Sequence, residues 1–242
     1  MWRFVGRVPA LEGANILAPT LLGYPPHKPV AIGQPVSVRD DAEHIRAMLP
    51  AGVTRLHLIG HSYGGVVALA MARLLAPIVA SVWVYEPVTF SALRNDPLGD
   101  PEARAEANAM FMSPAFLDPA VMGTEAWCAT FIEYWNGPGA FARLTPAQRA
   151  SVVAIGGKIV AELHSIFLGP ERFADWTCEA PLTIVYGAET RRPAAAIAHG
   201  LAQANPHAVL ESIAGATHMA PLHDPQSIHA SLDAHFRRTP RG

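Results

Sequence analysis

The stretch from residue 56 to residue 68 constrains the fold more than any other part of the chain. An apolar run leads into Gly60-x-Ser62-x-Gly64 and then into a helical run of small residues. This pattern predicts a strand, a sharp turn and a helix, with the serine held at the tip of the turn in a strained backbone conformation. We expect Gly60 and Gly64 to be required because a Cβ at either position would collide with the adjoining strand or helix. Ser62 is therefore the candidate nucleophile, and the main-chain N–H of Tyr63, at the start of the helix, is a candidate donor to an oxyanion.

The rest of the chain alternates between strand and helix patterns. Strands are expected at 14–19, 54–59, 78–85, 182–187 and 209–213. Helices are expected after the capping-box sequence Ser37-x-x-Asp40, over 63–75 and 192–204, and after Asp224-Pro225. This alternation predicts an α/β fold with a doubly wound, mostly parallel sheet whose active site lies at the carboxyl ends of the strands.

Residues 90–178 show no convincing strand pattern, and Asp100-Pro101 and Thr145-Pro146 read as helix starts. We expect this segment to be a helical cap inserted into one core that is formed by residues 1–89 and 179–242. Four aromatic residues of the segment fall at helical spacing: Trp127, Phe131, Tyr134 and Trp135. They line an apolar pocket over Ser62 or, on the alternative interpretation, form the interior of the cap itself.

A serine nucleophile needs a base, and the chain has eleven histidines. His218 lies in the small-residue loop Gly215-x-x-His218-x-x-Pro221, directly after the last predicted strand, and is the candidate base. His61 belongs to the turn and cannot easily aim its ring at Ser62. Solvated positions on helices are expected for His44, His199, His223, His229 and His235.

The Gly-x-Ser-x-Gly turn and the loop around His218 resemble the corresponding segments of the α/β-hydrolases, over roughly Leu11 to Phe236. The resemblance implies that Ser62 attacks a carbonyl carbon, that His218 acts as general base and then general acid, and that water cleaves the acyl-enzyme. A serine nucleophile argues against the dehalogenase and epoxide-hydrolase branches of the family, which use aspartate.

The family places a carboxylate beside the histidine, and two residues are candidates. The usual position, three residues after the glycine that ends the penultimate strand, holds Thr190, with Glu189 one residue earlier. A second position used in the family is the end of the strand after the turn helix, where this chain has Glu86. Because a charge after an apolar run is seldom buried without a partner, we favour Glu86 over Glu189.

The N-terminal segment departs from the family pattern. In the family, a strand ending in His-Gly precedes the segment that corresponds to 14–26 and supplies a second oxyanion-hole amide. Here Met1 falls where the following helix should already be under way. We therefore expect that the start lies at an internal methionine or that the protein departs from its family.

Composition narrows the possible partners. Net charge is −2 and no block of like charges is present, so neither nucleic acid nor an anionic membrane is expected as a partner. We expect no membrane span, no signal peptide, no metal and no cofactor, because the corresponding sequence patterns are missing. Cys128 and Cys178 are far apart, which predicts free thiols in a cytoplasmic protein, with a single disulfide as the alternative.

The expected function is thus hydrolysis of a small apolar ester, thioester or similar acyl compound. Two alternatives remain open: a non-catalytic or impaired binding protein of the same fold, and a carbon–carbon hydrolase or cofactor-free haloperoxidase that uses the same three residues.

Overall fold

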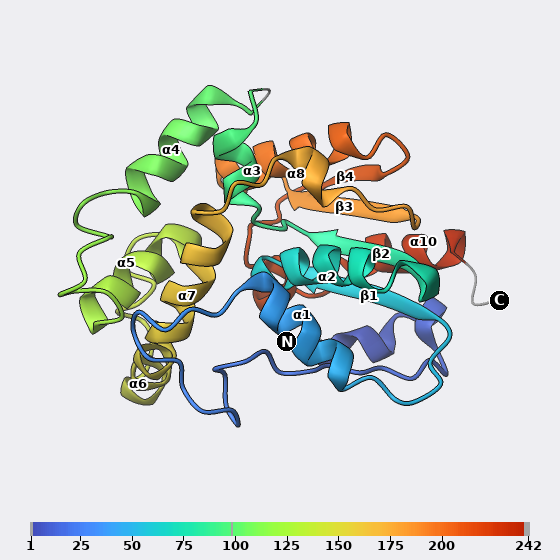
Figure 1. The fold of residues 1–242 in the computed structure, drawn as a ribbon, viewed down its shortest axis with the longest axis horizontal. Coiled ribbons are helices and arrows are strands. Elements are labelled where there is room, and N and C mark those ends of the chain that lie inside the picture. Colours follow the sequence, from blue (N-terminus) through green and yellow to red (C-terminus); the bar gives the residue numbers. More distant parts are fainter. Residues whose placement is uncertain (1, 98, 240–242) are drawn as a thin grey trace.

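The computed structural model describes residues 2–97 and 99–239, and its centre is a four-stranded parallel sheet (Figure 1). The strands are β1 (Leu56–His61), β2 (Val79–Tyr85), β3 (Leu182–Gly187) and β4 (Val209–Ile213), in the order β1-β2-β3-β4. The predicted α/β class with a parallel sheet is confirmed. The last two strands match their predicted bounds, and β1 begins two residues later than expected.

The register of the strands decides which loops meet. His61 pairs with Tyr85, and Tyr85 pairs with Val185, so β1, β2 and β3 end side by side. The residues that follow these strands, Ser62, Glu86 and the loop after Gly187, are therefore brought to one edge of the sheet.

Helices flank the sheet and fill the connection between β2 and β3. The elements are η1 (Trp2–Arg7), η2 (Pro9–Leu11), α1 (Val38–Ala47), α2 (Tyr63–Leu74), η3 (Ala76–Ile78), α3 (Phe90–Asn95), α4 (Pro101–Phe111), α5 (Glu125–Asn136), α6 (Pro146–Ala154), α7 (Gly156–Phe167), η4 (Phe173–Trp176), α8 (Arg192–Ala204), α9 (Ala220–His223) and α10 (His229–Arg238). The predicted starts of α1, α4 and α6 are confirmed, because Ser37, Asp100 and Thr145 cap them through their side chains.

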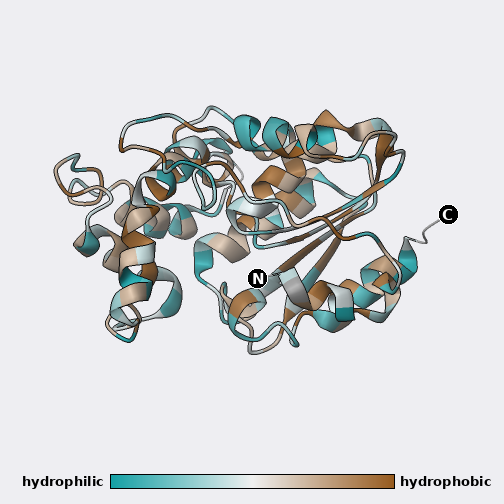
Figure 2. Ribbon diagram, turned by 90° about the horizontal axis from the view of Figure 1, so that it is seen from below, coloured by the Kyte–Doolittle hydropathy of each residue, from teal (hydrophilic) through white to brown (hydrophobic). Residues whose placement is uncertain are grey.

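The two faces of the sheet belong to two different apolar cores. Successive side chains of β2 point to opposite faces, so Val82 and Val84 join the core that contains α1, α2 and α8. Trp83 and Tyr85 join the second core, with Ile228 and other side chains of the C-terminal segment and of η1 and η2. Figure 2 shows the apolar strands between helical layers on both sides.

Within the described part of 90–178, all regular elements are helical, and α4 to α7 lie to one side of the sheet (Figure 1). The break between α6 and α7 falls at Ile155, directly before Gly156 and Gly157. No single described helix is long and apolar enough to cross a membrane. Helices α6 and α7 meet these two criteria only when they are taken together, and a bend of 50° separates them.

Two expectations about secondary structure are wrong. Residues 14–19 form no strand, and Ile16 and Leu17 are about half exposed. Apolar residues become a strand only where a neighbouring strand accepts their backbone hydrogen bonds, and this segment pairs with none of the four described strands. The closing helix does not begin after Asp224, because that residue ends α9 and a turn precedes α10.

Candidate active site

Ser62 occupies the strained turn that the sequence predicts. Its backbone angle φ is +55°, a value that residues with a Cβ seldom adopt. Its N–H donates to the carbonyl oxygen of Tyr85 over 3.0 Å. A Cβ at Gly60 would collide with the carbonyl oxygen of Gly64, so the expectation for Gly60 is confirmed. The expectation for Gly64 is wrong, because a Cβ there would meet open space. The close approach is made one residue later, where a Cβ on Gly65 would lie 3.0 Å from Pro87.

Three side chains from three loops form one hydrogen-bonded row. The Nε2 atom of His218 lies 3.0 Å from Ser62 Oγ, and its Nδ1 atom lies 2.6 Å from Glu86 Oε2. His218 is 3 % exposed and Glu86 is fully buried. Because a carboxylate can only accept, Nδ1–H donates to Glu86, and Nε2 is left with a lone pair facing the serine hydroxyl.

Glu86 directly follows β2 and is held from several directions. Like Ser62, it has a positive φ, +45°, and among the described residues other than glycine these are the two with a positive φ. Its Oε1 atom accepts the N–H of Gly187 over 2.8 Å, and its Oε2 atom also accepts the hydroxyl of Thr190 over 2.7 Å. The structure therefore brings Glu86, rather than the exposed Glu189, to His218. The hydrogen bond from Thr190 is not visible in the sequence, although Thr190 fills the position where the family usually has its acid.

His61 supports the loop that carries His218. Its Nε2 atom lies 2.8 Å from the carbonyl oxygen of His218, and its pKa is held well below the usual range, first by burial and then by the neighbouring His218. A neutral ring with its proton on Nε2 donates this bond. His61 thus fixes the main chain of the histidine loop rather than facing Ser62.

A second histidine differs more sharply from expectation. His235 on α10 is 1 % exposed, so its assignment as a solvated helix residue is wrong. Its two ring nitrogens lie 2.8 Å from Thr183 Oγ1 and 2.9 Å from Ser81 Oγ, and burial lowers its pKa to about 4. It belongs to a buried polar network between α10 and the sheet.

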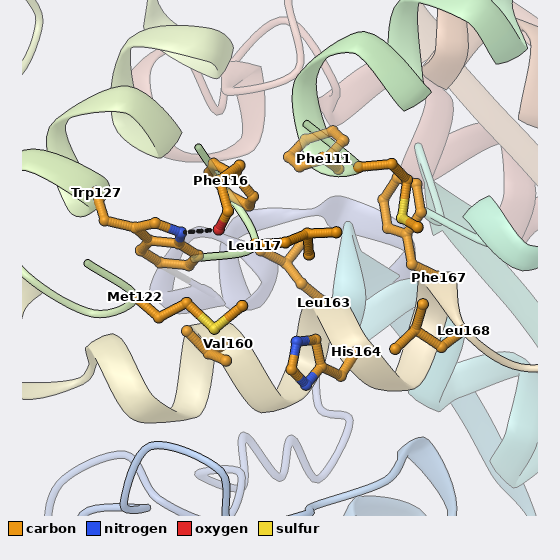
Figure 3. A pocket seen from close by; sticks show the side chains of 11 residues that line it. Phe111, Phe116, Leu117, Met122, Trp127, Val160, Leu163, His164, Phe167 and Leu168 are labelled. Atoms are coloured by element: carbon orange, nitrogen blue, oxygen red, sulfur yellow. Dashed lines mark hydrogen bonds between the residues drawn. The ribbon is translucent and has the colours of Figure 1, made fainter. Parts of the chain in front are cut away.

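The aromatic residues of α5 divide between the two interpretations. The ring of Trp135 stacks on His218, with the centroids 3.8 Å apart and the planes at 25°. Trp135 and Phe131 line a cavity of about 870 Å³ that also contains Ser62 and His218. Trp127 is buried inside the helical segment, where its indole N–H donates to the carbonyl oxygen of Phe116 and the adjacent cavity is only about 10 Å³ (Figure 3).

Tyr63 contributes both a main-chain and a side-chain group next to the serine. As the first residue of α2, it carries one of the N–H groups that an α-helix leaves without an intrahelical acceptor. Its phenol donates to Asp41 Oδ2 of α1 over 2.9 Å, which fixes the side chain away from Ser62. Burial and the nearby carboxylates of Glu162 and Asp41 raise the pKa of this phenol far above its usual range.

Across residues 2–97 and 99–239, no group of three or more histidine, cysteine or acidic side chains is arranged to hold a metal ion. Cys128 and Cys178 are both buried and are not joined by a disulfide.

Comparison with known proteins identifies the family. No curated protein sequence matches this chain. Among solved structures, an alpha/beta hydrolase enzyme from a Medee basin deep-sea metagenome library is 15% identical, covers 99% of this chain and 86% of its own, and gives a TM-score of 0.72. A mutant haloalkane dehalogenase from Agrobacterium tumefaciens is 20% identical and gives a TM-score of 0.68; the match covers 98% of this chain and 85% of the dehalogenase. An esterase from Thermogutta terrifontis is 16% identical, with coverage of 91% and 79% and a TM-score of 0.58.

These likenesses show the fold. The sequence profile described as the alpha/beta hydrolase family matches residues 1–230, which is most of the chain. The chain therefore belongs to the alpha/beta hydrolase family.

Proposed function

We propose that this protein is a serine hydrolase that cleaves an ester, thioester or similar carbonyl compound through an acyl-enzyme on Ser62. The observation that carries the proposal is the unbroken row of hydrogen bonds from Ser62 Oγ through His218 to Glu86. This order of hydroxyl, imidazole and carboxylate is the one that nucleophilic catalysis by serine requires, which supports the proposal.

The proposed reaction begins when Ser62 Oγ attacks the carbonyl carbon and its proton passes to His218 Nε2. Glu86 keeps the imidazole in the required tautomer and stabilises the imidazolium that forms. The N–H of Tyr63 donates to the developing oxyanion. His218 then gives the proton to the leaving group, and water, activated by the same imidazole, releases the acid from the enzyme.

Trp135 adds a feature specific to this chain. A cation next to the face of an indole is stabilised electrostatically, so the stacked ring favours the imidazolium over the neutral imidazole. Since an imidazolium forms when His218 takes the proton from Ser62, this contact lowers the energy of the charged intermediates of the proposed reaction.

The nature of the nucleophile favours acyl transfer over the reactions named for some structural neighbours. The solved structures include an epoxide hydrolase and a haloalkane dehalogenase as well as esterases. The dehalogenase and epoxide-hydrolase branches use aspartate as nucleophile, whereas this chain has Ser62 at the turn. The cavity of about 870 Å³ lies over Ser62 and is lined largely by apolar side chains, which suits an apolar acyl group.

A fluorophosphonate probe tests the proposal. We expect the folded protein to be labelled on Ser62 and to hydrolyse p-nitrophenyl esters, and we expect S62A to lose both properties. H218A should lose most of the labelling rate while the protein remains folded. If the folded wild-type protein is not labelled, the proposal fails and a non-catalytic binding protein of the same fold is the better account. Labelling without turnover of any ester or thioester would favour a carbon–carbon hydrolase or haloperoxidase.

A further inference from the structure

A group of buried charges lies next to the candidate active site, between α7 and α1. Lys158 Nζ of α7 is 2.5 Å from Asp41 Oδ2 and 3.5 Å from Oε1 of Glu162, one turn further along α7. The side chains of Lys158 and Asp41 are fully buried, and Glu162 is 8 % exposed. The group thus holds two carboxyl groups but one ammonium.

Lys158 and Asp41 satisfy each other. Besides the ion pair, Asp41 accepts the N–H of Leu22 and the hydroxyl of Tyr63, each over 2.9 Å. The ammonium of Lys158 also lies 5.0 Å from the ring centroid of Tyr63. The ammonium of Lys158 therefore interacts more strongly with Asp41, at 2.5 Å, than with Glu162, at 3.5 Å.

Glu162 is left incompletely compensated. Its Oε1 atom is buried and has no hydrogen-bond partner. An unmatched carboxylate in such a position is costly, and burial raises the pKa of Glu162 to about 7. The hydroxyl of Tyr24 also faces this carboxylate, and its own pKa is raised by burial and by Glu162.

Glu162 also borders the space that would hold a substrate. Glu162 lines the cavity that contains Ser62 and His218, together with Tyr24 and Phe131. Val160, Leu163 and Phe167 point from the other side of α7 into the interior of the helical segment (Figure 3). Helix α7 thus presents one apolar face to its own segment, while Ile159 and Glu162 line the cavity.

We propose that Glu162 recognises a positively charged amino group on the substrate, so that the preferred substrate is an acyl compound whose chain ends in a protonated amine. The proposal rests on the proposed function, in which the cavity over Ser62 is the substrate pocket. A primary ammonium in the cavity would donate a charge-assisted hydrogen bond to the Glu162 carboxylate and supply the positive charge that the buried group lacks. The aromatic rings of Tyr24 and Phe131 offer further favourable contact to such a cation.

Matched esters test this inference on the active enzyme. p-Nitrophenyl ω-aminooctanoate and p-nitrophenyl nonanoate have equal chain length and differ in the terminal ammonium. We expect the wild-type protein to favour the amino ester by on the order of 10- to 100-fold in kcat/KM, the range for a hydrogen bond to a charged group. E162Q keeps the shape but not the charge, and should bring this ratio close to one. E125Q, which changes an exposed carboxyl group at the start of α5, should keep the wild-type ratio.

An unchanged ratio in E162Q would overturn the inference, as would equal preference of the wild-type protein for p-nitrophenyl ω-hydroxyoctanoate, which carries a neutral donor. A binding experiment separates this failure from failure of the proposed function. Hexylammonium should raise the Tm of S62A but not that of the double variant S62A/E162Q. Hexanol, which is neutral, should affect the Tm of the two variants equally. If Ser62 is inert but hexylammonium still stabilises through Glu162, the hydrolase proposal fails and the amine site stands. If esters are cleaved and neither readout depends on Glu162, only the amine site fails.

Discussion

Replacing Glu86 by glutamine should remove nearly all activity, because the structure determines which way the new amide must point. The carboxylate accepts from Gly187 N–H on Oε1, and from Thr190 and His218 on Oε2. A glutamine has one oxygen, and Gly187 N–H can only donate. Turning the amide so that its NH₂ group faces this N–H would bury two donors against each other, at about 1–3 kcal/mol for each one left unpaired.

The amide oxygen should therefore face Gly187, and the NH₂ group should face His218 Nδ1. That nitrogen would then accept, and the proton of the neutral imidazole would move to Nε2, where it blocks proton transfer from Ser62. A wrong tautomer of this kind typically costs about 10⁴-fold in kcat, which corresponds to about 5 kcal/mol in the barrier.

The assay compares the second-order rate constant of fluorophosphonate labelling and the kcat/KM for a p-nitrophenyl ester in E86Q, in E189Q and in the wild-type protein. E189Q makes the same chemical change on an exposed side chain near the same loop and should stay within about twofold of wild type, as is usual for surface changes. If folded E86Q keeps a tenth or more of the wild-type rate constant, or if E189Q loses as much as E86Q, the assignment of Glu86 is refuted.

Three further outcomes are expected. W135A should lower kcat/KM about 2- to 30-fold, the range for loss of 0.5–2 kcal/mol of cation–π stabilisation of the His218 imidazolium, and W135F should recover part of it; equal rates in W135A and wild type would contradict this role. G60A should lower the free energy of unfolding in urea by about 1–3 kcal/mol or more, whereas G64A should change it little; the reverse order would show that the turn is packed differently. His235 has a folded pKa of about 4, below its unfolded value, so its neutral form is favoured on folding and its contribution is lost as pH falls from about 6.5 toward 4. Between pH 7 and pH 5, the wild-type protein should therefore lose about 2 kcal/mol more unfolding free energy than H235N does. If both proteins lose the same amount, His235 is not buried in its neutral form.

Local sequence patterns were sufficient for the parts of the molecule that depend on neighbouring residues. The turn around Ser62 is indicated by Gly60-x-Ser62-x-Gly64, although the second close approach is made by Gly65 rather than by Gly64. The residues that cap α1, α4 and α6 lie within four residues of each helix start. Glu86 is favoured in the sequence because a charge at the end of a buried strand needs a partner. The strand register that brings Thr190 to the same carboxylate is a property of β2 and β3 together, and no pattern in either strand reveals it.

The errors have the same origin. The spacing of apolar residues on α10 predicts which side of the helix is buried, but it does not reveal the polar groups of β2 and β3 beneath it. It therefore does not predict the burial of His235 against Ser81 and Thr183. Residues 14–19 have the composition of a strand, but pairing depends on what lies beside them. Helical periodicity placed Trp135 on α5 and left open which tertiary neighbour its ring would meet.

The stack of Trp135 on His218 also bears on how this scaffold can be re-engineered. The ring that stacks on the His218 imidazole comes from α5, a helix that lies between β2 and β3 in the sequence. Ser62 and Glu86, which are hydrogen-bonded to the imidazole, directly follow β1 and β2. Replacing residues 90–178 by a foreign insertion would remove the aromatic neighbour of His218 even if Ser62 and Glu86 stayed in place. In this protein the insertion and the chemistry have to be redesigned together.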